Sequence, residues 1–315
     1  MYLFFGNDNE IEKLKTYNIL EGFYKNKPAI LVGNGINLMS QTMSWEDLLN
    51  KISQNFQINV RVKKDKSFPL IFEELIFKSE REYQETLDSF KEQINSELNG
   101  LVNNKYHDQL MKLNCYDYLT TNYDYSLERV FNSRFNESVR NSRETKYSLY
   151  RNNVIENKKI WHIHGELNHG FEKRRSVHES IMIGNEHYGD YHRKVHELLK
   201  PPGSILTALE NERDSWPKRF FTHDVHIVGL SLDFSETHLW WILNYRARLL
   251  KVFGKIPNEI YFHLPSFSQD KHRSKIELLE ALNINIIPTV VKSKIENDYK
   301  TFWEILLNVT LPNYI

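Results

Sequence analysis

Cysteine is almost absent from the sequence, because Cys115 is the only one among 315 residues. A single thiol excludes a disulfide within the chain and any zinc cluster built from cysteines alone. Disulfides are typical of oxidising compartments, so their exclusion makes the reducing cytoplasm the expected location.

An excess of either charge is also lacking, since 41 Lys and Arg residues balance 41 Asp and Glu residues. Nucleic-acid-binding proteins usually carry a basic excess, so we expect no direct binding of nucleic acid. No apolar run approaches the roughly 20 residues of a membrane-spanning helix, and acidic residues follow the opening "MYLFF" too soon for a signal peptide. We therefore expect a globular cytoplasmic protein without membrane association.

What the sequence does contain is an alternation of short apolar runs and amphipathic segments. Runs typical of strands lie at 29–32, 116–122, 159–165, 224–232, 258–265 and 284–291. Helical patterns lie at 11–26, 44–56, 69–113, 125–131, 235–250, 269–282 and 296–309. Ser44 with Asp47 predicts a capping box, and Ser235 predicts an N-cap.

This alternation predicts an α/β protein with a doubly wound, parallel, Rossmann-like sheet. We expect one domain over 1–315, a helical insertion over 57–113 after the first strand, and an irregular insertion over 166–222. Ligands of such sheets bind outside the carboxyl ends of the strands. Four of the expected strands end in glycine or polar residues: Gly33-Asn34-Gly35, Thr120-Thr121-Asn122-Tyr123-Asp124, His162-Ile163-His164-Gly165 and Gly229-Leu230-Ser231.

At the first of these ends, Gly33 and Gly35 would let the backbone approach a diphosphate closely, and N–H groups of a following helix would bind its oxygens. The full dehydrogenase fingerprint is not met, because Leu38 stands at the third glycine and no acidic residue ends a second strand about 20 residues on. A hydride-transfer enzyme is therefore disfavoured. For these glycines taken alone, a tight turn without a ligand is as well supported as a phosphate-binding turn.

The second and third strand ends carry the candidate catalytic groups. Asn122 offers a donor and an acceptor to sugar hydroxyls, whereas Asp124 is favoured as the N-cap of the expected helix at 125–131. His162 and His164 would share one face of a regular strand, but a zinc site there lacks further ligands. A buried histidine bonded to backbone is the commoner arrangement, and His164 is better placed as a general base.

Three further features receive plainer interpretations. Gly229 and Ser231 allow close approach of a ligand and offer it a hydroxyl. The pair Trp240 and Trp241 is predicted to pack in the core. His192 and His196, four residues apart, are predicted to lie on a solvated helix face.

The four motifs occur in a particular order, "GNGIN", "TNYD", "IHG" and "VGLSL", and this order resembles that of the sirtuins. The resemblance extends over about 28–250 and is strongest to the sirtuin-like domains of bacterial anti-phage defence systems. In those domains a Ser-Ile stretch ending in Tyr follows His-Gly, as Ser180 to Tyr188 does here.

The resemblance implies that NAD⁺ is the substrate and that Asn122 and His164 are the catalytic residues at its nicotinamide ribose. It implies a further set of NAD⁺-binding residues: Gly33, Asn34, Gly35, Asn37, Thr121, Asp124, Gly229 and Ser231. It also implies cleavage of NAD⁺ to nicotinamide and ADP-ribose as an NAD⁺-depleting effector of abortive infection, controlled by homo-oligomerisation or by a partner defence protein such as an ATPase or a sensor.

This sequence departs from the sirtuin pattern in four places. Asn34 replaces a small residue of the turn, Asn37 replaces a serine, and Thr121 replaces a glutamine. The four-cysteine zinc module of protein deacylases is excluded by Cys115 being alone, so the resemblance implies neither zinc nor another metal here. An acyl-lysine groove is disfavoured, whereas cleavage of NAD⁺ by water remains available.

Three other functions remain open on the sequence. The first is a catalytically silent module that binds NAD⁺ or ADP-ribose or scaffolds a defence complex. The second is a deacylase or an ADP-ribosyltransferase. The third is a metal-dependent nuclease or phosphoesterase that uses His162, His164 and Asp124.

Overall fold

The structure is a computed structural model of the 315-residue chain. It describes residues 18–40, 44–63, 66–133, 135, 145, 147–167, 180–199, 205–211, 213–292, 295 and 298–315. Parts of the irregular insertion expected over 166–222, namely 168–179, 200–204 and 212, lie outside the described residues.

Seven strands form one sheet in the order β3-β4-β2-β1-β5-β6-β7. They are β1 (Pro28–Val32), β2 (Asp117–Thr120), β3 (Asn153–Ile155), β4 (Lys158–His162), β5 (Asp224–Val228), β6 (Ile260–Pro265) and β7 (Asn285–Thr289). All neighbours are parallel except β3 and β4. The predicted Rossmann-like α/β fold is confirmed, with the unexpected short strand β3 added at one edge.

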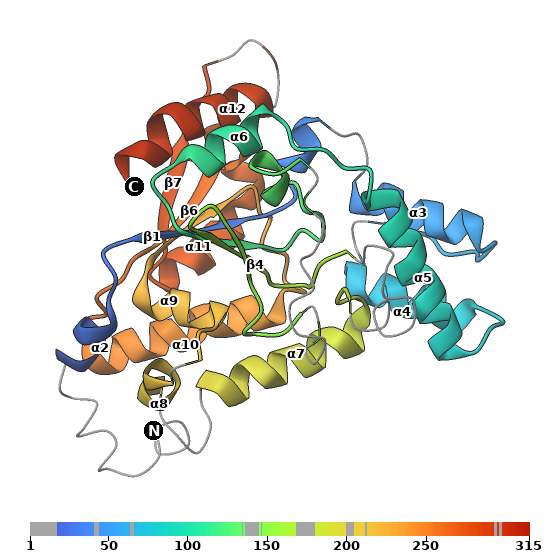
Figure 1. The fold of residues 1–315 in the computed structure, drawn as a ribbon, viewed down its shortest axis with the longest axis horizontal. Coiled ribbons are helices and arrows are strands. Elements are labelled where there is room, and N and C mark those ends of the chain that lie inside the picture. The colour runs from blue at the N-terminus through green and yellow to red at the C-terminus, as the bar shows by residue number, and fades with distance from the viewer. Residues whose placement is uncertain are drawn as a thin grey trace.

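Helices cover both faces of this sheet (Figure 1). Those of the first half are α2 (Asn18–Phe23), α3 (Trp45–Asn55), α4 (Phe68–Lys78), α5 (Tyr83–Leu98) and α6 (Lys105–Lys112). Those of the second half are α7 (Gly184–Leu199), α8 (Ile205–Glu210), α9 (Arg219–Thr222), α10 (Thr237–Phe253), α11 (Arg273–Ala281) and α12 (Tyr299–Ile305). No helix of the described residues is both long and apolar enough to cross a bilayer.

Three apolar clusters hold these layers together. One joins a face of the sheet to α7, α9 and α10, and includes Trp161, Trp216 and Trp240. Another joins the opposite face to α6 and α12 through residues such as Tyr118 and Trp303. The third packs α3, α4 and α5, which lie between β1 and β2 in sequence, to one side of the sheet (Figure 1).

Local expectations were confirmed at some helix termini and wrong at others. The capping box of α3 forms, since Ser44 Oγ accepts from the N–H of Asp47 and the Asp47 carboxylate accepts from the N–H of Ser44. Ser235 does not cap α10, because its hydroxyl and its N–H both donate to Asp233 Oδ1.

The helix expected over 125–131 is replaced by a single 3₁₀ turn, Glu128–Val130. The Glu128 side chain is fully buried, with Oε1 2.9 Å from Nε2 of His162 on β4. An amphipathic helix over this segment would expose Glu128 to solvent, whereas in the structure Glu128 is buried and pairs with His162. Asp124 is consequently not a helix N-cap; its Oδ1 accepts from the N–H of Ser126 in a tight turn.

Candidate active site

A cavity of about 680 Å³ lies at the carboxyl ends of the central strands. This volume is within the range of about 300–1,000 Å³ that is typical of small-molecule sites. Six of the predicted site residues line it: Asn34, Gly35, Thr121, His164, Gly229 and Ser231. Four others, Gly33, Asn37, Asn122 and Asp124, are not among its lining residues.

The two glycines of the first turn have a different role from the one expected. The N–H of Gly33 donates to Val228 O at 3.0 Å and that of Gly35 donates to Gly229 O at 2.8 Å. A Cβ on Gly33 would lie 2.6 Å from Leu230 Cα, and a Cβ on Gly35 would lie 2.7 Å from Gly229 O. These glycines therefore allow the loops after β1 and β5 to pack backbone against backbone, and their own N–H groups are already paired.

Asn37 is the centre of a buried cluster that we call the Asn37 network: Asn34, Asn37, Asn104, His107 and Asp124. The Asn37 Nδ2 group donates to Asp124 Oδ2 at 2.8 Å and to Asn34 Oδ1 at 3.1 Å. His107 Nε2 lies 3.0 Å from Asn37 Oδ1, while His107 Nδ1 accepts from the N–H of Asn104. Burial lowers the pKa of His107 to about 4 although the nearby carboxylates of Asp124 and Asp108 oppose the shift, so the ring is neutral and Nε2 carries the donated proton.

Asn122 faces a second, small cavity of about 20 Å³, which Asn34, Asn37 and Asp124 also line. Asn34, Ser44, Trp45 and Tyr123 line both cavities and lie between them. The Asn122 Nδ2 group donates a long bond of 3.4 Å to Gly33 O. The structure thus divides the predicted residues between two adjoining spaces, with Asn122 in the smaller and His164 in the larger.

His162 and His164 lie close in sequence but point to different partners. His162 donates from Nδ1 to Asn122 O at 2.9 Å and contacts Glu128 through Nε2. Burial disfavours the imidazolium, but the charge of Glu128 and its hydrogen bond outweigh burial and raise the pKa of His162 to about 9. The expectation of a buried histidine bonded to backbone is confirmed for His162, which fixes the peptide of Asn122.

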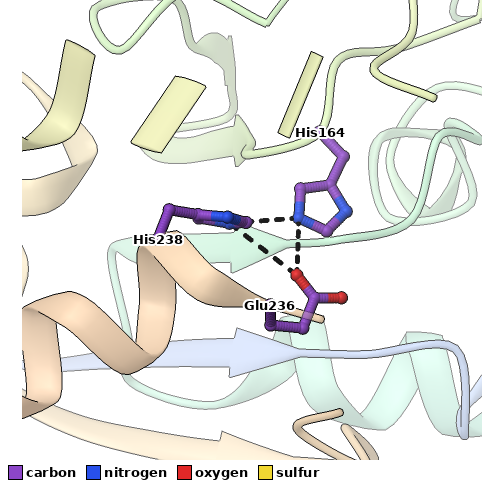
Figure 2. Close-up of side chains that lie close together, drawn as sticks. All are labelled: His164, Glu236 and His238. Atoms are coloured by element: carbon purple, nitrogen blue, oxygen red, sulfur yellow. Dashed lines mark hydrogen bonds and ion pairs between the residues drawn. The ribbon is translucent and has the colours of Figure 1, made fainter. Parts of the chain in front are cut away.

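His164 and His238 are buried and contact the half-buried Glu236 in a cluster that we call the His164 triangle (Figure 2). Its Nε2 lies 3.0 Å from Glu236 Oε2 and 3.2 Å from His238 Nε2, and the third edge, from His238 Nε2 to Glu236 Oε2, is 3.8 Å. On the other side of the ring, Nδ1 lies 3.4 Å from the hydroxyl of Tyr188. Burial, reinforced by the neighbouring histidines, holds the pKa of His238 well below its ordinary value.

Comparison with protein families agrees with this geometry. A family model described as a SIR2-like domain matches residues 117–287, more than half of the chain. The chain belongs to the SIR2-like family. No curated protein matches it.

Membership of the SIR2-like family points to NAD⁺-related activity, and SIR2-like domains are often NAD⁺-dependent enzymes. The matched SIR2-like region contains Asn122, His164, Gly229 and Ser231. The turn Gly33-Asn34-Gly35 lies outside the matched region. It follows β1, and β1 pairs with β2 and β5, so the turn lies beside the loops that follow those two strands.

Sequence reasoning missed two residues of the His164 triangle, Glu236 and His238. It followed the polar strand end as far as Ser231 and treated the next residues only as the start of a helix. Residues from the end of a parallel strand through the first turn of the following helix lie at the ligand-binding edge of the sheet, and this rule would have found both. Tyr188, which lines the cavity, ends the Ser180–Tyr188 stretch that the sequence did single out.

The structure also bears on an alternative that the sequence left open for the histidines and on one expectation about them. Among the described residues, the side chains that converge as metal ligands do are those of the His164 triangle, and not His162, His164 and Asp124. His192 and His196 are half-buried and contact the ring of Trp241, so they do not form a solvated face. The predicted core packing of Trp240 is confirmed, since it is 8% exposed within the main apolar cluster.

Proposed function

We propose that this SIR2-like protein hydrolyses NAD⁺ to nicotinamide and ADP-ribose. The observation that carries the proposal is the position of His164 on the wall of the cavity into which the loops after β1, β2 and β5 also project. The family supplies NAD⁺ as the expected ligand, and the cavity supplies a concave space with the imidazole of His164 in its wall.

In the proposed reaction, the bond between nicotinamide nitrogen and C1′ of the ribose breaks, and the electron pair leaves with neutral nicotinamide. Positive charge develops on the ribose, and a water oxygen bonds to C1′. His164 accepts the proton of this water at Nδ1, since Nε2 faces Glu236 and His238. The Glu236 carboxylate, 3.0 Å from Nε2, would stabilise the imidazolium that forms. Metal chemistry is not required, because the leaving group departs from a cation as a neutral molecule.

The predicted binding residues have distinct roles in this proposal. Asn34, Thr121, Gly229 and Ser231 line the cavity and would contact the ribose and phosphates. Asn122 would orient a ribose hydroxyl or the water after Asn34 or Tyr123 moves away from the wall that they form between the two cavities. Gly33, Gly35, Asn37 and Asp124 would hold that wall in place through the contacts described above.

We further propose that the protein acts in the cytoplasm as an NAD⁺-depleting effector of anti-phage defence. Unregulated hydrolysis of NAD⁺ would starve the cell that makes it, so the activity requires control. Homo-oligomerisation, or binding to an ATPase or phage-sensing partner, would supply that control. The support for this context is the resemblance of the motif order to sirtuin-like defence domains.

A second candidate function is a silent module that binds NAD⁺ or ADP-ribose. The observation that favours it is the location of Asn122 outside the large cavity. A silent module would retain ligand binding and lack turnover, whereas a hydrolase would show both.

The decisive experiment incubates the purified full chain with NAD⁺, with and without candidate partners, and measures nicotinamide and ADP-ribose. We expect activity in the wild type and a loss of about 100-fold or more in His164→Ala and Asn122→Ala. His196→Asn, a histidine substitution on α7 outside the cavity lining, is the matched control. Wild-type activity in His164→Ala would refute its role as the base. Tight binding of ADP-ribose without hydrolysis under every condition would establish the silent module instead.

A further inference from the structure

We propose that the His164 triangle is a binding site for a divalent transition-metal ion, with His164 Nε2, His238 Nε2 and Glu236 Oε2 as ligands. The ion would occupy the wall of the cavity and would not take part in the hydrolysis proposed above. The site is inferred from the positions of three donor atoms that are brought together from the end of β4 and from the start of α10 (Figure 2).

The spacing of these atoms fits one small cation. A triangle with edges of 3.0, 3.2 and 3.8 Å has its corners about 2.0 Å from a common centre. Zinc bonds to histidine nitrogen and carboxylate oxygen are about 2.0–2.2 Å long, so an ion near this centre would reach all three atoms at bonding distance.

The hydrogen bonding of the triangle is incomplete without such an ion. Glu236 Oε2 is inaccessible to solvent and faces His164 Nε2 at 3.0 Å and His238 Nε2 at 3.8 Å. A proton on His164 Nε2 can point to Glu236 Oε2 or to His238 Nε2, 3.2 Å away, but not to both, so one of these two buried acceptors has no donor. A buried acceptor without a donor is costly, and a cation between the three atoms would remove that cost.

The donor set selects the class of metal. Two imidazole nitrogens with one carboxylate oxygen suit zinc and neighbouring transition metals, whereas Mg²⁺ and Ca²⁺ prefer all-oxygen sites. Three protein ligands leave a fourth position open, as in metal sites that exchange water or ligand. His164 and Glu236 line the cavity, so the open position would face it.

A metal ion bound at the His164 triangle would prevent His164 from acting as the general base. This inference about inhibition rests on the proposed hydrolase function. A neutral imidazole carries one proton on one nitrogen. A metal ion on Nε2 of His164 therefore leaves the proton on Nδ1, which can then donate to Tyr188 and cannot accept from water. We infer that Zn²⁺ inhibits the enzyme and that its removal releases the activity.

Binding is tested on the full chain without any activity measurement. Protein freed of metal with EDTA, then freed of EDTA, is titrated with Zn²⁺ against a coloured chelator, and with Co²⁺ to record the visible spectrum of its coordination. We expect one Zn²⁺ per chain, no competition by Mg²⁺, and a four-coordinate Co²⁺ spectrum. Glu236→Gln and His238→Asn should weaken Zn²⁺ binding by at least about 100-fold, because loss of a ligand exceeds loss of a supporting contact.

His196→Asn is the control, since His192 and His196 lie four residues apart on α7 and are a histidine pair outside the triangle. It should bind Zn²⁺ as the wild type does. Absence of stoichiometric binding in the wild type, or unchanged binding in folded Glu236→Gln, would overturn the site. Glu236→Gln is nearly isosteric and its side chain reaches the surface, and a cooperative thermal transition would establish that it folds.

Inhibition is a separate measurement, scored for each variant against its own rate without metal. Zn²⁺ should inhibit wild type and His196→Asn, and should inhibit His238→Asn only at concentrations raised about 100-fold. Zn²⁺ binding without NAD⁺ cleavage in any sample would refute the proposed function and leave the metal site standing. Cleavage that persists at saturating Zn²⁺ would refute the inhibitory role.

Discussion

The Asn37 network and the His164 triangle are both buried polar clusters near the carboxyl edge of the sheet, but their hydrogen bonding differs. In the network, both nitrogens of His107, the amide of Asn37 and both oxygens of Asp124 have protein partners. In the triangle, His238 Nδ1 has no partner among the described residues, and the single proton on His164 Nε2 can serve either Glu236 Oε2 or His238 Nε2 but not both. Complete pairing is typical of a cluster that maintains the fold, whereas incomplete pairing is typical of one that receives a ligand.

Asn37→Ala breaks the complete cluster and should have the largest effect on stability. The substitution leaves Asp124 Oδ2 and His107 Nε2 buried without partners, which should lower the free energy of unfolding by about 2–4 kcal/mol. Denaturant unfolding followed by circular dichroism measures this loss. Asn308→Ala, at an exposed asparagine of the C-terminal segment, is the control and should change stability by less than about 0.5 kcal/mol. Equal effects of the two substitutions would contradict the structural role of the network.

His107→Gln tests whether the Asn37 network makes the stability of the protein depend on pH. Because burial holds the pKa of His107 at about 4 in the folded state, the unfolded chain binds the proton first as pH falls below about 6.5. This difference should remove roughly 1–2 kcal/mol of wild-type stability between pH 7 and pH 5. A glutamine side chain at this position would keep a donor and an acceptor but would not titrate.

Other buried histidines contribute to the wild-type pH dependence, so the measurement is the difference between the two slopes of unfolding free energy against pH. His107→Gln should show the shallower slope. A matching control is His272→Gln, whose histidine is more exposed and should leave the slope nearly unchanged. Identical slopes for wild type and His107→Gln would mean that His107 is not held neutral by the network.

Much of the sheet was predictable because its central strands β1, β2 and β5 are buried on both faces and appear as short apolar runs. The motif order also identified His164, Thr121 and the loops after β1 and β5 as parts of one edge. The predictions that were wrong concern residues whose roles depend on contacts between distant segments. Glu128 has the composition of a helix surface but pairs with His162, and the Gly33 and Gly35 N–H groups pair with the end of β5 and the loop after it. Local periodicity contains no information about such partners.

The triangle was missed for a related reason. Glu236 and His238 look like ordinary first-turn residues of an amphipathic helix, and their convergence on His164 depends on how α10 packs against β4. Asn37 was predicted as a ligand-binding residue because it follows the glycine turn, yet its side chain is fully engaged with Asp124 and His107. The position of a residue along the chain was enough to predict that it lies at this edge of the sheet. Whether its side chain supports the fold or faces the cavity depends on contacts with distant segments.

Glu236→Gln, made in the incomplete cluster, should have the smallest effect on the stability of the metal-free protein. The substitution removes a charge at the N-terminus of α10, which costs about 0.3–1 kcal/mol, but it also removes the cost of keeping a negative charge on the buried oxygen Oε2. The two effects oppose one another, so we expect a net change within about 1 kcal/mol. Thermal unfolding of protein freed of metal and then of EDTA measures it, and adding Zn²⁺ should then raise the melting temperature of the wild type but not of the variant. A loss as large as that of Asn37→Ala, in the absence of metal, would show that the triangle supports the fold in the same way as the network and would remove the contrast between them.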